Sequence, residues 1–317
     1  MSGFAYRVRG GKAERVEIKQ ALGAEADLIW VHLTTNNEEA KAWLTEEAGA
    51  PDYVVDSLTA TETRPRCDAL GDGAFLNLRG RSSEETTVSD PLASVRIWAT
   101  RGRVISVTRR ALIAVDDVVE AIEGGEIRDP GDLIAEFATA ITANLDPEVA
   151  DLGDTLDDCE ADLDADKVFE LRRNVTKVRV AAIGYRRFLT PQRAALEKLA
   201  ALPCDWLQDD DRLHLNSAAD RAARMAEELE SIRERAALTH EALTDLRSEQ
   251  IDNRALIIAV VAMVFLPLTF ITGLLGMNVD GIPFAHEPWA FDGVSLVCVA
   301  VAVVISLYFV QQHWFKR

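Results

Sequence analysis

The spacing of hydrophobic and polar residues changes along the chain, and the first 110 or so residues show the short period of β-strands. Helical stretches interrupt them, one with Trp43 and Leu44 on its apolar side and one at 54–58. Strands that alternate with helices predict an α+β domain in which a mixed sheet is covered by helices. The expected strands are 4–9, 15–18, 27–34, 74–79, 92–99 and 103–108.

From about residue 112 the apolar positions recur at helical spacing instead. The segment 146–166 keeps this spacing, yet it carries ten carboxylates and neither lysine nor arginine. We therefore predict a helix with an acidic face, which is either an ordinary solvated surface or a surface that collects cations at low affinity. An EF-hand loop is excluded, because no glycine lies mid-loop with a closing glutamate.

A very long helix is predicted to begin near Leu215 or Asn216, after the acidic segment 205–211 has broken the preceding helices, and to continue to Leu275. At about 1.5 Å per residue it would be roughly 80 Å long. A helix of that length cannot pack against one small domain alone, so we expect a bundle and therefore an oligomer. Its apolar residues follow heptad-like spacing at Ala222, Met225, Leu229, Ile232, Ala236, Leu243 and Leu246.

Two apolar runs near the end are candidates for membrane spans. The first, 255–275, has no charged residue and is as long as the about 20 residues that a helix needs to cross a bilayer. The second covers 294–310. Arg254 precedes the first run and the basic pair 316–317 follows the second, whereas the loop between them has neither lysine nor arginine. By the positive-inside rule both termini face the cytoplasm.

These patterns divide the chain into a cytoplasmic body, a stalk and a two-helix membrane part. We expect a cytoplasmic α/β domain at 1–112, a cytoplasmic helical region at 113–214, a stalk helix that continues as the first transmembrane helix at 215–275, a periplasmic loop at 276–293, a second transmembrane helix at 294–310 and a basic cytoplasmic tail at 311–317.

Composition narrows the chemistry. The chain has 52 acidic and 34 basic residues and a net charge of −18, which argues against nucleic acid as a partner. Its four cysteines are far apart with no CxxC pair, so a zinc knuckle or disulfide framework is not expected. The sequence also lacks a nucleophile triad, an HExxH motif and a phosphate-binding loop. We therefore expect neither an enzyme nor a bound cofactor.

One face of the long helix combines small residues with polar ones. A ring of such helices would enclose a pore with hydroxyls at Thr269, amides at Asn278, carboxylates nearer the cytoplasm and an apolar constriction at Leu266. The alternative is a packing seam, because small residues let membrane helices approach closely. At i+3/i+4 steps the face consists of Glu241, Asp245, Ser248, Asp252, Ala255, Ala259, Ala262, Leu266, Thr269 and Gly273.

At these residues the chain resembles the CorA superfamily of divalent-metal transporters. The matching stretch is 263–278, a proline-centred apolar span that ends in Gly-Met-Asn and is followed by a second span. The resemblance covers essentially the whole chain. It implies a homopentamer around one axial pore, surrounded by lipid in a bacterial inner membrane. It also implies that Asn278 lies in the ring that meets the hydrated ion, that Thr269 lines the pore, and that Gly276 and Met277 shape the turn.

Within the superfamily the chain is most similar to the ZntB branch, through 262–267, 281–283 after the Gly-Met-Asn, 62–66 and 209–212. This resemblance implies Zn²⁺ as the transported ion, with coupling to protons as a further expectation. Met277 departs from it, because ZntB proteins often replace that methionine. Transport of Mg²⁺, Co²⁺ or Ni²⁺ is the alternative. From another class, a membrane-anchored coiled-coil scaffold would explain the long helix without any ion flux.

The predicted path offers amide, hydroxyl and carboxylate groups but neither cysteine nor histidine, which favours passage of a hydrated cation. Asp252 is the candidate for a titrating pore group, since five charged copies around one axis would repel one another. Candidate metal-binding residues elsewhere are His286 and Glu287 in the outer loop, His240 beside Glu241, and His214 near 209–211, and each histidine has an ordinary solvated side chain as its alternative.

Overall fold

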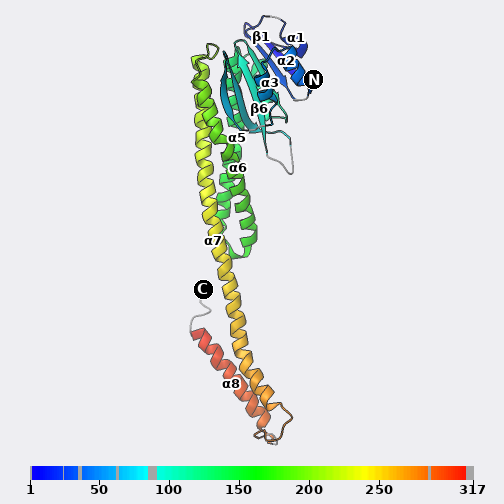
Figure 1. Ribbon diagram of the computed structural model, residues 1–317. Helices are drawn as coiled ribbons and strands as arrows, with labels where there is room; N and C mark the ends of the chain where they lie inside the picture. The colour runs from blue at the N-terminus through cyan, green and yellow to red at the C-terminus, as the bar shows by residue number, and fades with distance from the viewer. Residues whose placement is uncertain are drawn as a thin grey trace. The chain divides into compact units, whose positions relative to one another are not determined.

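The computed structural model describes residues 2–23, 25–34, 38–61, 64–84, 91–284 and 287–311 (Figure 1). The chain forms two compact units. The first consists of Met1–Asp162 and Phe169–His240, and the second of Leu163–Val168 and Glu241–Arg317. The helix α7, Asp209–Leu275, contributes residues to both units.

A seven-stranded mixed sheet forms the body of the first unit, in the order β2-β1-β3-β7-β6-β5-β4. The pair β3–β7 is parallel, and the other neighbouring strands are antiparallel. The predicted α+β class with a mixed sheet is thus confirmed. The strands are β1 Gly3–Arg9, β2 Lys12–Val16, β3 Leu28–Leu33, β4 Arg66–Leu70, β5 Gly73–Arg81, β6 Leu92–Thr100 and β7 Arg103–Thr108.

Helices cover both faces of this sheet. Phe75 on β5 lies in one apolar cluster with residues of α1, α2 and α3. Gly80 on the same strand faces α5, where a Cβ atom would lie 3.1 Å from Ile141. Because odd and even positions of a strand point to opposite faces, Phe75 and Gly80 mark the two sides. The helices are α1 Ile18–Ala21, α2 Glu38–Glu46, α3 Asp52–Thr59, α4 Ile113–Glu123 and α5 Pro130–Ala161.

In the first unit, α5, α6 (Val168–Ala200) and the first part of α7 pack together. The Cβ position of Gly153 on α5 lies 3.8 Å from Ile232 on α7, and Arg186 on α6 pairs with Glu230 on α7 at 3.1 Å. The heptad positions from Ala222 to Ala236 are buried in this single chain. This stripe therefore packs against α5 and α6 of the same chain, whereas the expected oligomer rests on the length of the helix and stays a prediction.

The long helix begins earlier than predicted. Its first residue is Asp209, not Leu215 or Asn216. The predicted break is present, because α6 ends at Ala200, but the last three residues of the acidic segment already belong to α7. Carboxylates in a first turn are stabilised by the helix dipole. Asp211 Oδ2 also accepts a hydrogen bond from the backbone N–H of Gln208 at 2.7 Å, which is half of a capping box.

Smaller differences concern the ends of other elements. The second strand is Lys12–Val16 instead of 15–18, because Ile18 begins α1. The edge strand β4 was not predicted, and its half-exposed residues show no clear apolar period. The acidic helix ends at Ala161, short of residue 166, and a 3-10 turn at Ala165–Lys167 precedes α6.

The second unit contains the remainder of α7 and α8, Ala290–Gln311, which begins before the predicted residue 294. Gln250 Nε2 on α7 donates a hydrogen bond to the carbonyl oxygen of Ala165 at 2.6 Å. Both helices are long and apolar enough to cross a membrane, and the most apolar stretch of α7 is 0% buried. The two predicted spans therefore correspond to two helices.

Candidate functional site

The predicted pore face of α7 is uncovered in a single chain. Leu266 is 69% exposed, and the other predicted members of this face are exposed as well. One chain supplies only one line of such residues, so it cannot by itself enclose a path. The exposed line comprises Glu241, Asp245, Asp252, Ala262, Leu266, Thr269 and Gly273.

The turn of α7 around Pro267 contains two oxygen atoms that can accept a hydrogen bond from outside the helix. Thr269 Oγ1 donates a hydrogen bond to the Phe265 carbonyl oxygen at 2.8 Å, so its hydroxyl oxygen keeps lone pairs for an outside donor. Pro267 has no N–H, so the carbonyl of Met263 loses the bond that a helical residue at 267 would give it. This turn thus carries two oxygen acceptors.

The Gly-Met-Asn turn follows directly on the last residue of α7, Leu275. The N–H of Gly276 donates to the Thr272 carbonyl oxygen at 2.9 Å. A Cβ atom at Gly276 would lie 2.8 Å from that oxygen, so the turn requires glycine here. Met277 and Asn278 then emerge with exposed side chains. The helix end therefore presents the amide of Asn278 to solvent.

The structure does not bring the two described candidate histidines, His214 and His240, together at a shared site. His286 lies outside the described residues, and Glu287 is exposed. His240 Nε2 lies 3.4 Å from Arg172 Nη2, so a cationic group already occupies one side of this imidazole. His214 is exposed on α7. Among the described residues, Glu287, His240 and His214 belong to no group of three close potential ligands.

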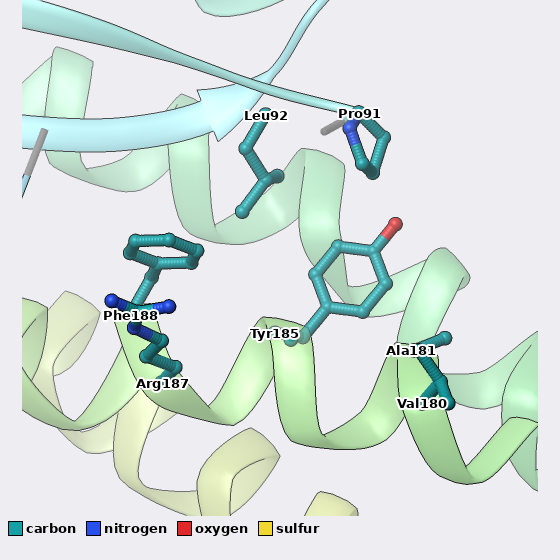
Figure 2. Close-up of a pocket in the computed structure, with 8 residues that line it drawn as sticks. Pro91, Leu92, Val180, Ala181, Tyr185, Arg187 and Phe188 are labelled. Atoms are coloured by element: carbon teal, nitrogen blue, oxygen red, sulfur yellow. The ribbon is translucent and has the colours of Figure 1, made fainter. Parts of the chain in front are cut away.

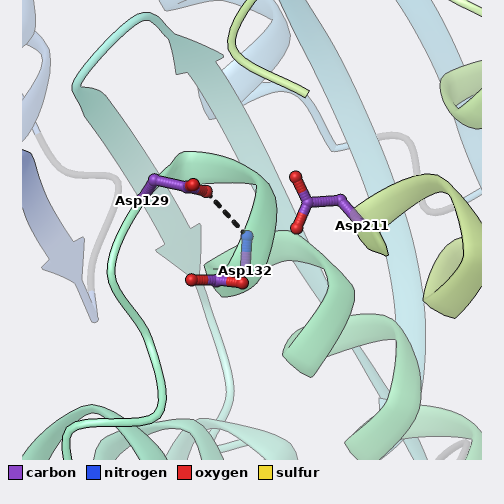
Figure 3. Close-up of side chains that lie close together, drawn as sticks. All are labelled: Asp129, Asp132 and Asp211. Atoms are coloured by element: carbon purple, nitrogen blue, oxygen red, sulfur yellow. Dashed lines mark hydrogen bonds between the residues drawn. The ribbon is translucent and has the colours of Figure 1, made fainter. Parts of the chain in front are cut away.

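One acidic cluster is not predicted by the sequence analysis. The carboxylates of Asp129, Asp132 and Asp211 offer oxygens that lie within 4.8 Å of one another (Figure 3). Asp129 Oδ1 accepts from the N–H groups of Gly131 and Asp132 at 2.8 and 3.0 Å, and Asp132 Oδ2 accepts from the N–H of Arg128 at 2.9 Å. These bonds cap α5. The signal was present as Asp-Pro-Gly-Asp at 129–132, a capping residue followed by a first-turn proline.

Asp211 is the buried member of this cluster, with 2% of its surface exposed. Its Oδ2 lies where a Cβ atom on Gly131 would clash at 1.9 Å, so glycine makes room for the carboxylate. Burial, together with the nearby charges of Asp129 and Asp132, raises the pKa of Asp211 to about 6. The cluster thus joins the N-termini of α5 and α7, and helix capping accounts for its carboxylates.

Comparison with known proteins supplies independent information. The profile of the family described as "CorA-like Mg2+ transporter protein" matches residues 25–317. The "Zinc transport protein ZntB" of Pectobacterium carotovorum subsp. carotovorum (strain PC1) is 31% identical over 286 residues, which are 90% of this chain and 87% of that protein.

Solved structures agree with this assignment. The structure of the full-length CmaX protein is 32% identical, with a TM-score of 0.78 and 98% of each chain covered. The complete structure of the CorA magnesium transporter from Methanocaldococcus jannaschii has a TM-score of 0.82 with 99% of each chain covered, and at 17% identity this likeness shows a shared fold.

Proposed function

The chain belongs to the CorA family of divalent-cation transporters, and on that premise we propose that five copies of it enclose an axial pore that carries Zn²⁺ across a bacterial inner membrane. The family consists of transporters and not of enzymes. The transported cation is the substrate, and the proposal requires no cofactor and no nucleic acid.

The exposed apolar surface of α7 is the observation that carries this proposal. The most apolar stretch of the helix is 0% buried in one chain, a surface that water does not favour. Lipid covers apolar side chains well, but it does not satisfy hydroxyls, amides or carboxylates. Thr269 and Asp252 lie on the same exposed face as the small residues Ala262 and Gly273. A ring of copies gives these polar groups a water-filled interior.

In such a ring each position of the face becomes five groups around the axis. Asn278 supplies amides at the outer mouth, where they exchange hydrogen bonds with the waters of a hydrated cation. Leu266 and Ala262 supply an apolar constriction that closes by dewetting. Asp252, Asp245 and Glu241 supply carboxylates on the cytoplasmic side, which raise the local concentration of cations.

The named relatives, and not the chemistry of the face, favour zinc as the ion. The relative at 31% identity is named a zinc transport protein. Mg²⁺ is the second candidate, favoured by the family description and by the magnesium transporter that shares the fold. The oxygen-only face suits either ion in hydrated form, because Mg²⁺ sheds its waters reluctantly and Zn²⁺ would need nitrogen or sulfur ligands for tight chelation.

The charges at the ends of the spans support a cytoplasmic position for both termini. Arg254 precedes the first span, whereas the loop after Asn278 carries Asp280, Glu287 and Asp292 without a basic residue. Cytoplasmic ends of membrane helices are the ones enriched in lysine and arginine. The loop then faces the periplasm, where its acidic residues meet incoming cations.

Metal flux into liposomes tests the proposal. We expect purified protein to carry Zn²⁺ faster than Mg²⁺, and Asn278→Ala to abolish this flux. Asn253→Ala is the matched control, because Asn253 is also exposed on α7 but lies beside the proposed face and should retain flux. Wild-type Zn²⁺ flux in Asn278→Ala would remove the role assigned to the turn, and absence of any metal flux in the parent protein would favour a scaffold.

Coupling to protons is proposed to involve Asp252. Five carboxylates around one axis repel one another when all are charged, so binding a proton relieves that repulsion. Asp252→Asn should make Zn²⁺ uptake insensitive to an imposed pH gradient, while Glu249→Gln, on a neighbouring exposed position, should leave the sensitivity unchanged. A pH response that persists in Asp252→Asn contradicts this role.

A further inference from the structure

The exposed faces of α5 and α6 carry opposite charges. On α5 the exposed acids include Asp151, Asp154 and Asp158, and within the described residues none of these three has an ion-pair partner. On α6 the exposed bases include Arg173 and Lys177, which likewise have no ion pair among the described residues. Both helices belong to the first unit, and each presents charges that its own chain does not neutralise.

The basic face of α6 is also apolar. Val180 and Ile183 are 64% and 48% exposed, although the opposite side of the helix buries Val175, Val178 and Ala182 in the core. Most helices of soluble units have one apolar stripe, and a second stripe indicates a second packing partner. With Arg173 and Lys177 the exposed stripe follows the i+3/i+4 spacing of a helix–helix contact.

A groove of about 350 Å³ opens on this face, between α6 and the start of β6 (Figure 2). Leu92 on β6 and Val180, Gly184 and Phe188 on α6 are among the residues that line it. At Gly184 a Cβ atom would meet nothing within 4 Å, so the groove has room for a side chain from outside.

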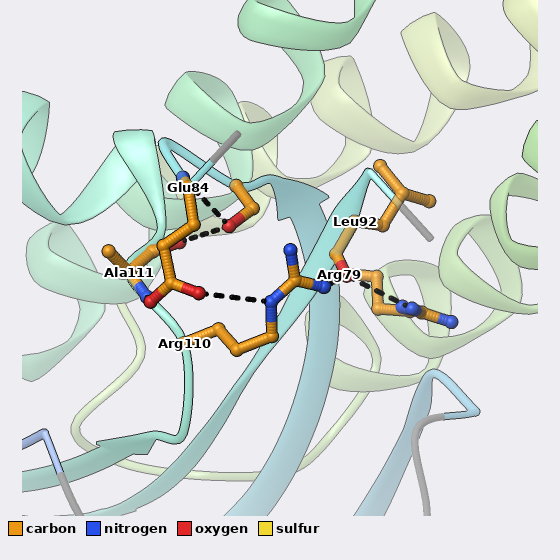
Figure 4. Close-up of polar contacts among 6 residues, drawn as sticks. Arg79, Glu84, Leu92, Arg110 and Ala111 are labelled. Carbon is orange, nitrogen blue, oxygen red and sulfur yellow. Dashed lines mark hydrogen bonds and ion pairs between the residues drawn. The ribbon is translucent and has the colours of Figure 1, made fainter. Parts of the chain in front are cut away.

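Hydrogen bonds hold the wall of the groove in place. The carbonyl oxygen of Leu92 accepts from Arg79 Nη2 at 3.1 Å and from Arg110 Nη1 at 3.3 Å, and Arg110 Nε in turn donates to Glu84 (Figure 4). The Arg79 guanidinium lies 3.8 Å from the centre of the Phe188 ring. The groove is therefore formed before anything binds, which lowers the cost of ordering it on association.

We propose that this α6 face docks the acidic α5 face of a neighbouring copy of the same chain. The inference rests on the proposed pentamer and adds a contact outside the membrane. The two faces differ, so the contact is of the head-to-tail kind that closes into a ring when it is repeated. Copies with a net charge of −18 repel one another in general, and a basic face meeting an acidic one offsets this at the contact.

The helices α5 and α6 form a helical hairpin, and its geometry predicts which residues of two neighbouring copies meet. Rotation about an axis that runs along the helices leaves every residue at its own height. Residues equally distant from the turn between α5 and α6 share a height, since both helices rise about 1.5 Å per residue. Asp154 lies seven residues before the end of α5 and Lys177 nine residues after the start of α6, and Asp158 and Arg173 differ by the same two residues. This offset of about 3 Å is within reach of a lysine or arginine side chain, so Asp154 meets Lys177 of the next copy and Asp158 meets Arg173. The exposed Ala150 lies within one residue of the height of Val180, beside the groove.

Zero-length crosslinking of the unmodified protein tests this register. A carbodiimide joins a lysine amine to a carboxylate that touches it, here Lys177 to Asp154. Protein labelled with ¹⁴N and protein labelled with ¹⁵N are purified separately, mixed, and reassembled in detergent. The masses of the crosslinked peptides then reveal whether a crosslink joins two copies. We expect mixed-isotope Lys177–Asp154 peptides. Crosslinks at Lys177 that join residues of one copy alone would overturn the proposal.

Charge exchange gives a second, independent readout. Arg173→Asp with Lys177→Asp, and separately Asp154→Lys with Asp158→Lys, should each raise the concentration at which the detergent-solubilised oligomer dissociates by about tenfold. The four substitutions combined should restore it, because each contact then pairs opposite charges again. Lys12→Asp with Lys19→Asp, exposed on β2 and α1, controls for net charge and should change nothing. If the variant with all four substitutions dissociates at the same concentration as the two double variants, the proposed contact is contradicted.

Zn²⁺ flux measured on the same proteins separates the two proposals. Normal flux from an oligomer without the mixed-isotope crosslink removes the docking contact and leaves the transport function standing. Absence of flux from a stable, crosslinked oligomer removes the transport function and leaves the contact standing.

Discussion

The helix α7 is continuous, but the apolar residues of its first part, in the first unit, and of its second part, in the second unit, are covered in different ways. From Ala222 to Ala236 the apolar stripe is buried by α5 and α6 of the same chain. In the apolar stretch that follows Arg254, the most apolar window is 0% buried. The first part therefore completes the fold of one chain, whereas the second part depends on lipid and on other copies.

This difference shows that a hydrophobic period indicates burial without identifying the partner. The heptad positions of the first part resemble those of an oligomeric coiled coil, yet intrachain packing accounts for them. The second part has no comparable heptad, since its apolar residues occur on every side and its distinctive feature is one line of small and polar groups. The part that looks like an oligomer interface is core, and the proposed assembly surface lies in the other part.

Leucine truncation should separate the two parts most strongly. Leu229 is 0% exposed and Leu266 is 69% exposed. We expect Leu229→Ala to lower the free energy of unfolding of the first unit by roughly 2 to 5 kcal/mol, because it leaves a cavity. Leu266→Ala should leave that free energy unchanged. Chemical denaturation of the detergent-solubilised protein, followed by tryptophan fluorescence, measures both. If both variants lower the free energy of unfolding equally, the proposed difference between the two parts of α7 is contradicted.

The start of α7 should respond to pH. The pKa of Asp211 is raised from 3.8 to about 6, so the folded state holds a proton that the unfolded chain has released between these values. Its contribution to stability is therefore complete below about pH 4 and is lost as the pH rises through about 6. Asp211→Asn keeps an oxygen acceptor for Gln208 and should be more stable than the parent by about 2 to 3 kcal/mol above pH 7, with little difference at pH 4.

Asp210→Asn is the control for this pH effect, because Asp210 is exposed in the same first turn. In the same denaturation measurement, its difference from the parent should change much less between pH 4 and pH 8 than that of Asp211→Asn, because the charge of Asp210 is the smallest of the causes that raise the pKa of Asp211. A parallel pH dependence in both variants would mean that the charge of the first turn, and not the burial of Asp211 against Gly131, governs the stability of this end.

Much of the fold follows from local patterns. The run of β3, apolar except for His32, and the runs of β5 to β7 are visible in the sequence because their side chains face a covered sheet. The edge strand β4 has no such signal, since it is half exposed and its sequence Arg-Cys-Asp-Ala-Leu mixes charged with apolar residues. Local pattern thus reveals buried strands better than edge strands.

Contacts between distant segments were not predictable in the same way. The run Asp209–Asp211 looks like a helix breaker by propensity, but in a first turn the charges of the exposed Asp209 and Asp210 favour the helix. The cluster with Asp129 and Asp132 arises only because two helix N-termini, far apart in the sequence, meet in the fold. By contrast, the residues of the proposed pore face could be proposed from the sequence. They lie on one helix at regular spacing, so no tertiary contact is needed to place them on the same side.

The smallest effect concerns Gly273, and it decides between a pore wall and a packing seam. A Cβ atom at Gly273 would meet nothing within 4 Å in one chain, so Gly273→Ala should favour the helix by about 0.5 to 1 kcal/mol. If the face lines a pore, the oligomer stays intact and Zn²⁺ flux falls, because a methyl group from each copy narrows the path. If the face is a seam, the oligomer dissociates more readily, because the helices can no longer approach as closely. Native mass spectrometry and liposome flux on the same preparation distinguish these results. Leu274→Ala, in the same turn but off the face, should alter neither. We expect the pore result, since a seam would leave the hydroxyl oxygen of Thr269 without a water-filled space to face.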